Sequence, residues 1–178
     1  TTADLPYTVS VLQQDDIQAK FVRNLPEAIA YVPGVMVQKS ANGQGSPFLR
    51  GFTGYRTLTL IDGVRYNNSV YRDGPNEYFS LIDFNAIENL EVFGGPTSVL
   101  YGSDAIGGAI YLRSKHSNYL NENAGKPFSH ALQRLSFASV DNSTQSRSEL
   151  RIGKGQQWGA HVGVSLKRFG DLRTANLG

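Results

Sequence analysis

The chain has 178 residues, of which 17 are basic and 15 acidic, so its formal net charge at pH 7 is +2. This balance gives no reason to expect a nucleic-acid partner, which would select a strongly basic surface. The chain contains no cysteine, which excludes a disulfide framework and a thiolate metal site. The length suits one domain, or one domain plus a piece of another, and no apolar run approaches the roughly 18 residues of a membrane-spanning helix.

The N-terminal part of the chain predicts short helices between short strands. A β-type run at residues 7–11 is followed by Asp15 or Asp16, either of which is a candidate cap for a helix that reaches residue 21. Asn24 is a good N-cap for a second helix, which we expect to end near Pro33. The following segments are a predicted strand at 35–37, a Gly/Ser/Asn loop at 39–48, a long loop at 67–80 and a strand at 87–92.

Asp62 and Gly63 form the strongest local signal in the chain. They separate two β-type runs, 57–61 and 64–66. An Asp-Gly pair between such runs predicts a two-residue hairpin turn. We therefore interpret Asp62 as a turn residue rather than as a catalytic carboxylate.

Residues 94–114 form a glycine-rich stretch that could be taken for a phosphate-binding loop. The stretch lacks both the Gly-Lys-Ser/Thr ending of a Walker loop and the G-x-G-x-x-G dinucleotide pattern. It carries too much apolar surface for a solvated linker. We expect a packed unit in which Pro96 starts a helical turn, Gly102 ends it, and residues 109–113 form a strand. Residues up to about 115 thus predict an α+β unit with a small mixed sheet.

Residues from about 130 onward alternate between apolar and polar positions. One parity of the last segment is apolar and comprises Trp158, Ala160, Val162, Val164 and Leu166. The other parity is small, polar or charged and comprises Gly159, His161, Gly163, Ser165 and Lys167. This period is typical of membrane β-barrel strands, with one face toward lipid and the other toward the interior. A soluble hairpin with one wet face has the same period, so periodicity alone leaves both readings open.

No catalytic or metal site is predicted. The three histidines, His116, His130 and His161, lack the spacing of metal ligands. The carboxylates Asp83, Glu88 and Asp104 show no partner that suggests acid–base pairing, and no Ser-His-Asp arrangement can be defended from sequence. We therefore expect neither an enzyme nor a bound cofactor.

Several blocks in order resemble the plug domain of TonB-dependent outer-membrane receptors. These blocks are NLPEAIAYVPGVMVQ (24–38), LRGF (49–52), LIDGVR (60–65) and NLEVFGGPTSVLYGSDAIGGAIYLRSK (89–115). The resemblance spans roughly residues 8–115, and the ordered set is far more specific than any single block. The alternating segments that follow look like the first strands of the family's barrel.

The resemblance implies a plug domain at residues 1–115, a linker loop at 116–129 and the first antiparallel transmembrane barrel strands at 130–178. It further implies a receptor in the outer membrane of a Gram-negative bacterium, in contact with membrane lipid and energised by the inner-membrane TonB complex. The implied activity is uptake of a scarce nutrient, which we expect to be an iron complex such as a siderophore or haem. The alternative is a free-standing plug-like module that acts in interaction or signalling without transport.

The chain departs from the family pattern in three places. The family usually has Arg before the Gly-Pro pair, where this chain has Gly94. That Arg ties the plug to acidic residues of the barrel wall, so Arg50 and Arg65 become the candidates for plug–barrel anchoring. Residues 1–6 do not resemble the family's TonB box, and residues 130–178 supply only about three strands. An open three-stranded sheet would leave unpaired edges in lipid, so we expect the chain to be a fragment of a longer receptor.

Two loops are candidate ligand contacts, because the plug's outer loops face the extracellular side in this family. They span residues 42–48 and 67–78. Their candidate ligand-binding residues are Gln44, Tyr66, Tyr71, Arg72, Asn76 and Tyr78. Tyr and Arg offer contact area and hydrogen bonds at low entropic cost. The open alternative is that these side chains only pad the plug against the barrel loops.

Overall fold

We describe the protein from a computed structural model that covers residues 8–41, 43–66, 74–75, 78–95, 101–102, 104–115, 126–155 and 157–171. The chain divides into two compact units, Thr1–Ser114 and Lys115–Gly178. The buried apolar residues all lie between Ile17 and Leu112, so the first unit carries its own hydrophobic core.

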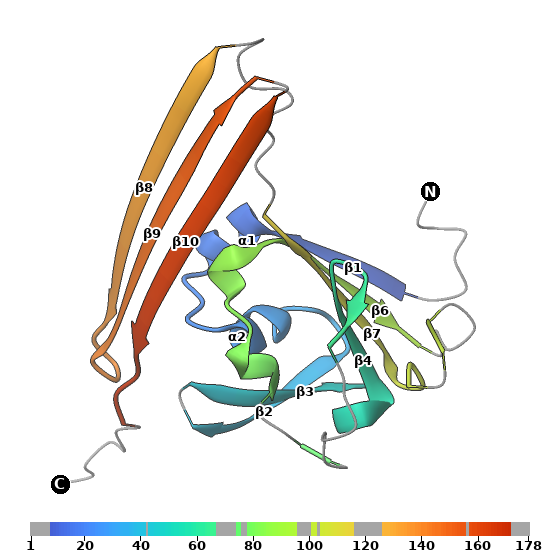
Figure 1. Ribbon diagram of the computed structural model, residues 1–178. Coiled ribbons are helices and arrows are strands. Elements are labelled where there is room, and N and C mark those ends of the chain that lie inside the picture. The colour runs from blue at the N-terminus through green and yellow to red at the C-terminus, as the bar shows by residue number, and fades with distance from the viewer. Residues whose placement is uncertain are drawn as a thin grey trace, which may run out of the picture. The chain divides into compact units, whose positions relative to one another are not determined.

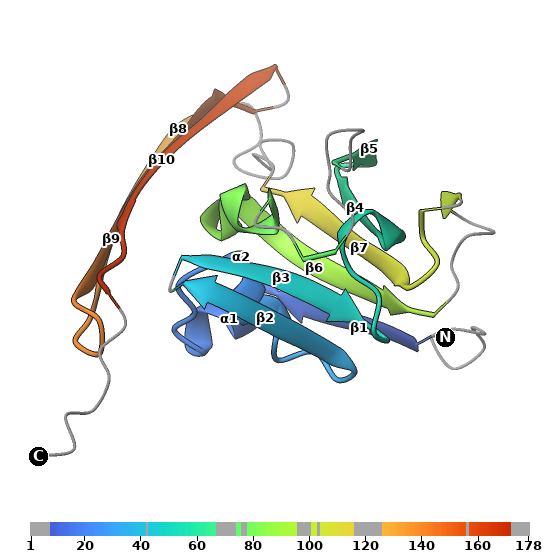
Figure 2. The same cartoon turned by 90° about the horizontal axis from the view of Figure 1, so that it is seen from below.

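The centre of the first unit is a five-stranded mixed sheet of order β1-β6-β7-β4-β5. The strands of this sheet can be followed in this order, from β1 to β5, in Figure 2. Its strands are β1 (Thr8–Gln13), β4 (Thr57–Ile61), β5 (Val64–Arg65), β6 (Ile87–Gly94) and β7 (Gly108–Ser114). β4 and β7 pair in parallel, whereas the other pairs are antiparallel. The predicted α+β unit with a small mixed sheet is therefore confirmed.

A separate two-stranded sheet corrects the expected loop at 39–48. β2 (Val35–Ala41) and β3 (Gln44–Leu49) pair antiparallel, so only two residues of the chain, 42 and 43, separate them (Figure 1). The Gly, Ser and Pro residues of Gln44–Leu49 suggested a loop. They form a strand nevertheless, because Pro is tolerated in an edge strand. Here Pro47 lies opposite Val37 in a two-stranded ribbon.

Two of the described segments, α1 and α2, are short helices that pack onto these sheets. α2 (Leu25–Ile29) has the predicted cap, since the Asn24 side chain accepts a hydrogen bond from the Glu27 N–H at 2.9 Å. α1 (Gln14–Ala19) starts earlier than expected, with Gln13 at the N-cap position. The Asp16 carboxylate accepts from the Gln13 N–H at 3.3 Å, so Asp16 is the third helical residue of a capping box rather than the cap.

Among its described residues, the unit also contains the 3₁₀-helices η2 (Gly54–Arg56), η3 (Tyr78–Leu81) and η4 (Phe84–Ala86). The main core joins both helices to the sheet through fully buried side chains that include Leu25, Ile29, Leu90 and Leu112. Burial of each such side chain contributes about 1.5–3 kcal/mol.

The predicted hairpin at Asp62–Gly63 is confirmed. Ile61 pairs with Val64, and both turn residues have positive φ, at 50° and 82°. Two positive φ values define the type I′ turn that an Asp-Gly pair favours. The Asp62 carboxylate accepts a hydrogen bond from the Ser114 N–H at 2.8 Å, which ties the turn to the end of β7.

Glu27 links α2 to β2. Its carboxylate accepts from Arg23 Nη2 at 2.6 Å and from Lys39 Nζ at 3.0 Å. Burial alone would raise the pKa of Glu27, but the hydrogen bonds from Arg23 and Lys39 hold this pKa below its usual value of 4.5. A carboxylate with a lowered pKa stabilises the fold above the unfolded pKa, and this contribution is lost as the pH falls through the folded value.

We therefore expect Glu27→Gln to reduce the stability that the first unit loses when the pH falls from neutral to below about 4.5. The measurement is the melting temperature of the purified first unit from pH 7 to pH 3. Asp15→Asn, which changes an exposed carboxylate on α1, is the control. Its melting temperature should fall between pH 7 and pH 3 by as much as that of the parent. If the melting temperatures of the parent and of Glu27→Gln fall equally at acid pH, the Glu27 ion pairs do not cause the pH dependence of stability.

The second unit is a curved antiparallel sheet of three long strands, which Figure 2 shows from the side. These are β8 (Pro127–Ala138), β9 (Ser143–Lys154) and β10 (Trp158–Arg168), with β9 in the middle. β8 begins at Pro127 rather than near residue 130, because Pro is tolerated as the first residue of a strand. The expected antiparallel strands after the plug unit are confirmed.

The two faces of this sheet differ in character. The apolar parity of β10 is exposed, with Val162 and Val164 at 61% and 55%. The same face of β8 and β9 is more polar than the pattern of β10 suggests. There the Gln133 amide donates to Ser146 Oγ at 3.0 Å, and the Ser148 hydroxyl donates to Gln133. These polar groups bond to one another, which is the condition for placing them in an apolar environment.

A search for helices long and apolar enough to cross a membrane finds none among the described residues.

Candidate functional site

The two candidate ligand loops meet at their stems in the first unit. Tyr66 follows β5, and Tyr78 opens η3, so these residues flank the loop at 67–77. The Tyr66 hydroxyl donates to the Tyr78 carbonyl at 3.1 Å, and the Tyr66 ring packs against the core. Tyr66 therefore closes the base of this loop.

Gln44 lies at the other candidate loop, as the first residue of β3. Its side chain is exposed, and Ser40 Oγ lies 3.5 Å from its Oε1. The remaining predicted ligand residues, Tyr71, Arg72 and Asn76, lie outside the described residues.

Ser80 was not predicted from the sequence, although it connects the two loop stems. Its hydroxyl accepts from the Gly45 N–H at 2.9 Å and donates to the Gly45 carbonyl at 3.3 Å. A lone serine after a long loop gives no sequence signal for this role, because the contact spans 35 residues.

The two predicted anchoring arginines lie in different environments. Arg65 forms an ion pair with Asp104 and donates to the Tyr101 carbonyl at 3.1 Å. Its guanidinium is therefore engaged inside the plug unit.

Arg50 is exposed and has a positive φ of 50°. Within the described part of the chain, its guanidinium makes no hydrogen bond or ion pair. It lies beside Gly94 and Gly95. Arg50 Nη1 is 3.5 Å from where a Cβ on Gly95 would lie, and Nε is 4.0 Å from the equivalent point on Gly94. Arg50 and Gly94 also line a pocket with Val92 and Pro33.

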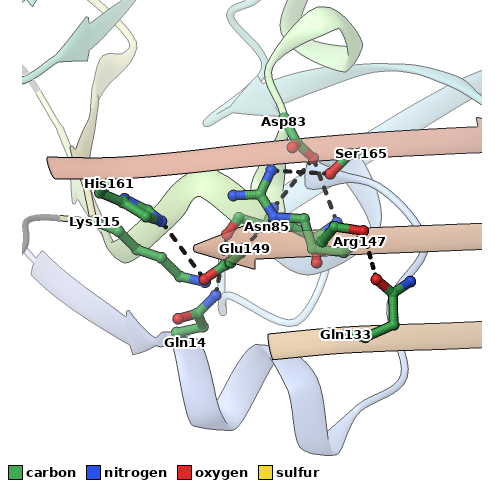
Figure 3. Close-up of polar contacts among 10 residues, drawn as sticks. Gln14, Asp83, Asn85, Lys115, Gln133, Arg147, Glu149, His161 and Ser165 are labelled. Carbon is green, nitrogen blue, oxygen red and sulfur yellow. Dashed lines mark hydrogen bonds and ion pairs between the residues drawn. The ribbon is translucent and has the colours of Figure 1, made fainter. Parts of the chain in front are cut away.

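A second polar cluster lies on one face of the second unit, around Glu149 of β9 (Figure 3). The Glu149 carboxylate accepts from Lys115 Nζ at 2.8 Å and from Arg147 Nε at 2.9 Å. His161 Nε2 lies 3.7 Å from the same carboxylate, and Arg147 Nη1 donates to Ser165 at 3.2 Å. The predicted polar parity of β10 thus shares its face with the charged residues of β9.

Arg147 also explains a glycine in β10. A Cβ on Gly163 would lie 2.2 Å from Arg147 Nη2, so the guanidinium needs the space that glycine leaves. The sequence shows the glycine but not the side chain that lies over it.

The described residues contain no group of three or more His, Asp or Glu side chains placed to hold a metal ion.

The comparisons with known proteins concern both units. The sequence model of the TonB-dependent Receptor Plug Domain family matches residues 1–109. The iron-regulated outer membrane virulence protein of Vibrio cholerae is 40% identical over 110 residues, which are 59% of this chain and 17% of that protein. The vitamin B12 transporter BtuB of Vibrio vulnificus is 33% identical over 147 residues, which are 78% of this chain and 23% of the transporter.

Solved structures show the same fold at low sequence identity. Pyoverdine-bound FpvA of Pseudomonas aeruginosa matches 92% of this chain with a TM-score of 0.69 and 17% identity, over 20% of its own length. The enterobactin-bound receptor PfeA of the same species matches 89% of this chain with a TM-score of 0.62 and 19% identity, over 24% of its own length. The chain therefore spans about a quarter or less of each of these proteins.

Proposed function

The chain belongs to the TonB-dependent receptor plug domain family, and from that premise we propose that it forms the plug and first barrel strands of an outer-membrane receptor that takes up a scarce nutrient. The family is one of receptors and transporters, which agrees with the absence of any predicted catalytic site. The observation that carries the proposal is the plug-family match over residues 1–109, together with the three antiparallel strands that lie farther along the chain, from Pro127 onward. In a receptor of this kind the TonB complex supplies the energy, and the outer membrane of a Gram-negative bacterium is the location.

We propose an iron complex as the first candidate ligand. The support is the iron-regulated Vibrio cholerae relative, together with the Tyr and Arg content of the loop at 67–78. A cobalamin is the second candidate, because the vitamin B12 transporter of Vibrio vulnificus matches a larger share of the chain. Binding of ferric enterobactin, haemin and cyanocobalamin to a complete receptor that contains these residues decides between the two.

The ligand-loop proposal is tested by replacing Tyr71, Arg72 and Tyr78 together with alanine in that receptor. We expect binding of the preferred probe to weaken by at least about tenfold, since aromatic and arginine contacts commonly contribute 1–2 kcal/mol each. The measurement is equilibrium binding and radiolabelled uptake at equal surface expression. Tyr55→Ala, an exposed tyrosine on η2, is the control. Unchanged binding in the triple variant would show that the three side chains only pack the plug against the barrel loops and do not contact the ligand.

We further propose that Arg50 rather than Arg65 anchors the plug to the barrel wall. Arg50 presents a guanidinium without an ion-pair partner in the described residues, and it lines a surface pocket together with Gly94. Arg65 already pairs with Asp104.

The two arginines should therefore respond differently to alanine substitution. We expect Arg50→Ala to leave the unfolding free energy of the isolated plug unit within about 0.5 kcal/mol of the parent, as for an ordinary surface change. In a complete receptor it should make the plug easier to extract with urea. Arg65→Ala should instead lower the stability of the isolated unit by about 1 kcal/mol, because the Asp104 ion pair and the Tyr101 contact are lost. The reverse ranking in the isolated unit would contradict this assignment.

A further inference from the structure

We propose that η3 is a bridge that fixes the two candidate ligand loops relative to each other, with Ser80 and Tyr66 as its positioning residues. Figure 2 labels two of the segments concerned in the first unit, the β2–β3 hairpin and β5; the third is η3 (Tyr78–Leu81). The inference rests on the proposed function only in naming these loops as ligand contacts.

The first half of the bridge joins η3 to the hairpin. The register of β2 and β3 is broken between Gln38 and Ala41, and Gly45 lies opposite this irregularity. The single hydroxyl of Ser80 bonds both the N–H and the carbonyl of Gly45, which is buried. A buried backbone group without a partner is costly, so this hydroxyl specifies where η3 lies against β3.

Gly45 is packed too closely against α2 and β2 to carry a side chain. A Cβ at this position would lie 2.8 Å from Pro26 Cβ and 3.1 Å from Val37 Cγ1. α2 and β2 therefore hold Gly45 from one side while Ser80 bonds its backbone. The start of β3 is therefore in contact with α2, β2 and η3.

The second half of the bridge joins η3 to β5. The Tyr66 hydroxyl donates to the Tyr78 carbonyl at 3.1 Å, across the base of the loop at 67–77. Tyr66, Phe79 and Ser46 line one small pocket, so β5, η3 and β3 converge at the same point. Tyr66, Tyr78, Ser80 and Gly45 form one continuous path from the stem of one loop to the stem of the other.

The physical consequence is preorganisation. Two loops that are fixed relative to each other before binding lose less conformational entropy when a ligand contacts both. A shift of either loop stem is passed to the other through η3, because each connecting bond joins a side-chain hydroxyl of one segment to a backbone group of the next.

The test uses two independent measurements on a complete receptor that contains these residues. The first is the distance distribution between spin labels attached through Gln44→Cys and Pro75→Cys, measured by double electron–electron resonance. This stretch of the receptor carries no native cysteine. We expect Ser80→Ala and Tyr66→Phe each to broaden the distribution. Ser80→Thr, which keeps a hydroxyl, should restore the parent width.

Thr53→Val is the matched control. It removes a buried hydroxyl that bonds Ser46 at 3.0 Å and the Pro47 carbonyl at 2.7 Å, so it loosens the part of the chain next to Gly45 without removing a bond of η3. We expect Thr53→Val to leave the distribution of distances between the two spin labels as narrow as in the parent. An unchanged width in both bridge variants, or equal broadening in Thr53→Val, would overturn the bridge.

The second measurement is binding of ferric enterobactin, haemin or cyanocobalamin, whichever the parent receptor binds. We expect Ser80→Ala to weaken binding about tenfold, the effect of losing one buried hydrogen-bond pair, with Ser80→Thr restoring it. Broadened distances with unchanged binding would support the bridge and contradict the assignment of the loops as ligand contacts. A parent that binds none of the three probes would count against the proposed function, while the distance measurement still decides the bridge.

Discussion

Gly108→Ala is expected to lower the unfolding free energy of the plug unit by about 4 kcal/mol or to prevent its folding. Gly108 begins β7 with a φ of +143°, a conformation that other residues rarely adopt. A Cβ there would lie 2.3 Å from the Phe93 carbonyl oxygen and 2.8 Å from Leu49 Cδ2. The carbonyl belongs to the neighbouring strand β6, so relief requires moving the backbone of the central sheet.

Gly34→Ala separates this clash from backbone strain. Gly34 also has a positive φ, at +80°, but no atom lies within 4 Å of the position its Cβ would take. We expect a loss of about 1–2 kcal/mol, which is the cost of the left-handed conformation alone. Urea unfolding of the purified first unit measures both variants. Equal losses in Gly34→Ala and Gly108→Ala would show that the contact with Phe93 is unimportant.

The glycine pair Gly107–Gly108 shows what the sequence could and could not predict. The glycines were expected to be structural, and the strand that follows was expected at 109–113 and lies at Gly108–Ser114. Local signals were sufficient there, as they were for the type I′ turn at Asp62–Gly63 and for the cap at Asn24. Each of these features depends on backbone preferences within about four residues.

Features that depend on distant residues could not be predicted. The segment Gln44–Leu49 reads as a loop by composition, and only its pairing with β2 and its contact with Ser80 make it a strand. The Arg65–Asp104 pair spans 39 residues, so the sequence could not separate Arg65 from Arg50 as an anchor. The polar patch of Gln133, Ser146 and Ser148 was missed because the pattern of β10 was extended to the whole sheet.

Val162→Arg is expected to impair assembly of a complete receptor that contains these residues. We propose that the apolar parity of β10 faces lipid. Val162 lies near the middle of this strand, and its side chain is 61% exposed. A charge on the lipid face near mid-membrane destabilises a barrel by about 2–4 kcal/mol, whereas the same charge on the inner face costs less.

The control must place the same side chain on the opposite face. Gly163→Arg and Ser165→Arg are unsuitable, because Arg147 lies over Gly163 and donates to Ser165. His161→Arg is the better match. His161 is adjacent to Val162, points to the polar face and lies 3.7 Å from the Glu149 carboxylate, which can accept a cation.

Heat-modifiable mobility of the receptor in detergent or lipid measures the folded fraction of each variant. We expect His161→Arg to keep most of the parent's folded fraction and Val162→Arg to lose it, because only Val162→Arg places an unpaired charge in hydrocarbon. The bonded polar patch of Gln133, Ser146 and Ser148 on the same face makes the result informative. If that patch marks a wetted surface rather than a lipid-facing one, Val162→Arg will assemble as well as His161→Arg. Equal assembly would then favour a sheet with one solvated face over the barrel wall.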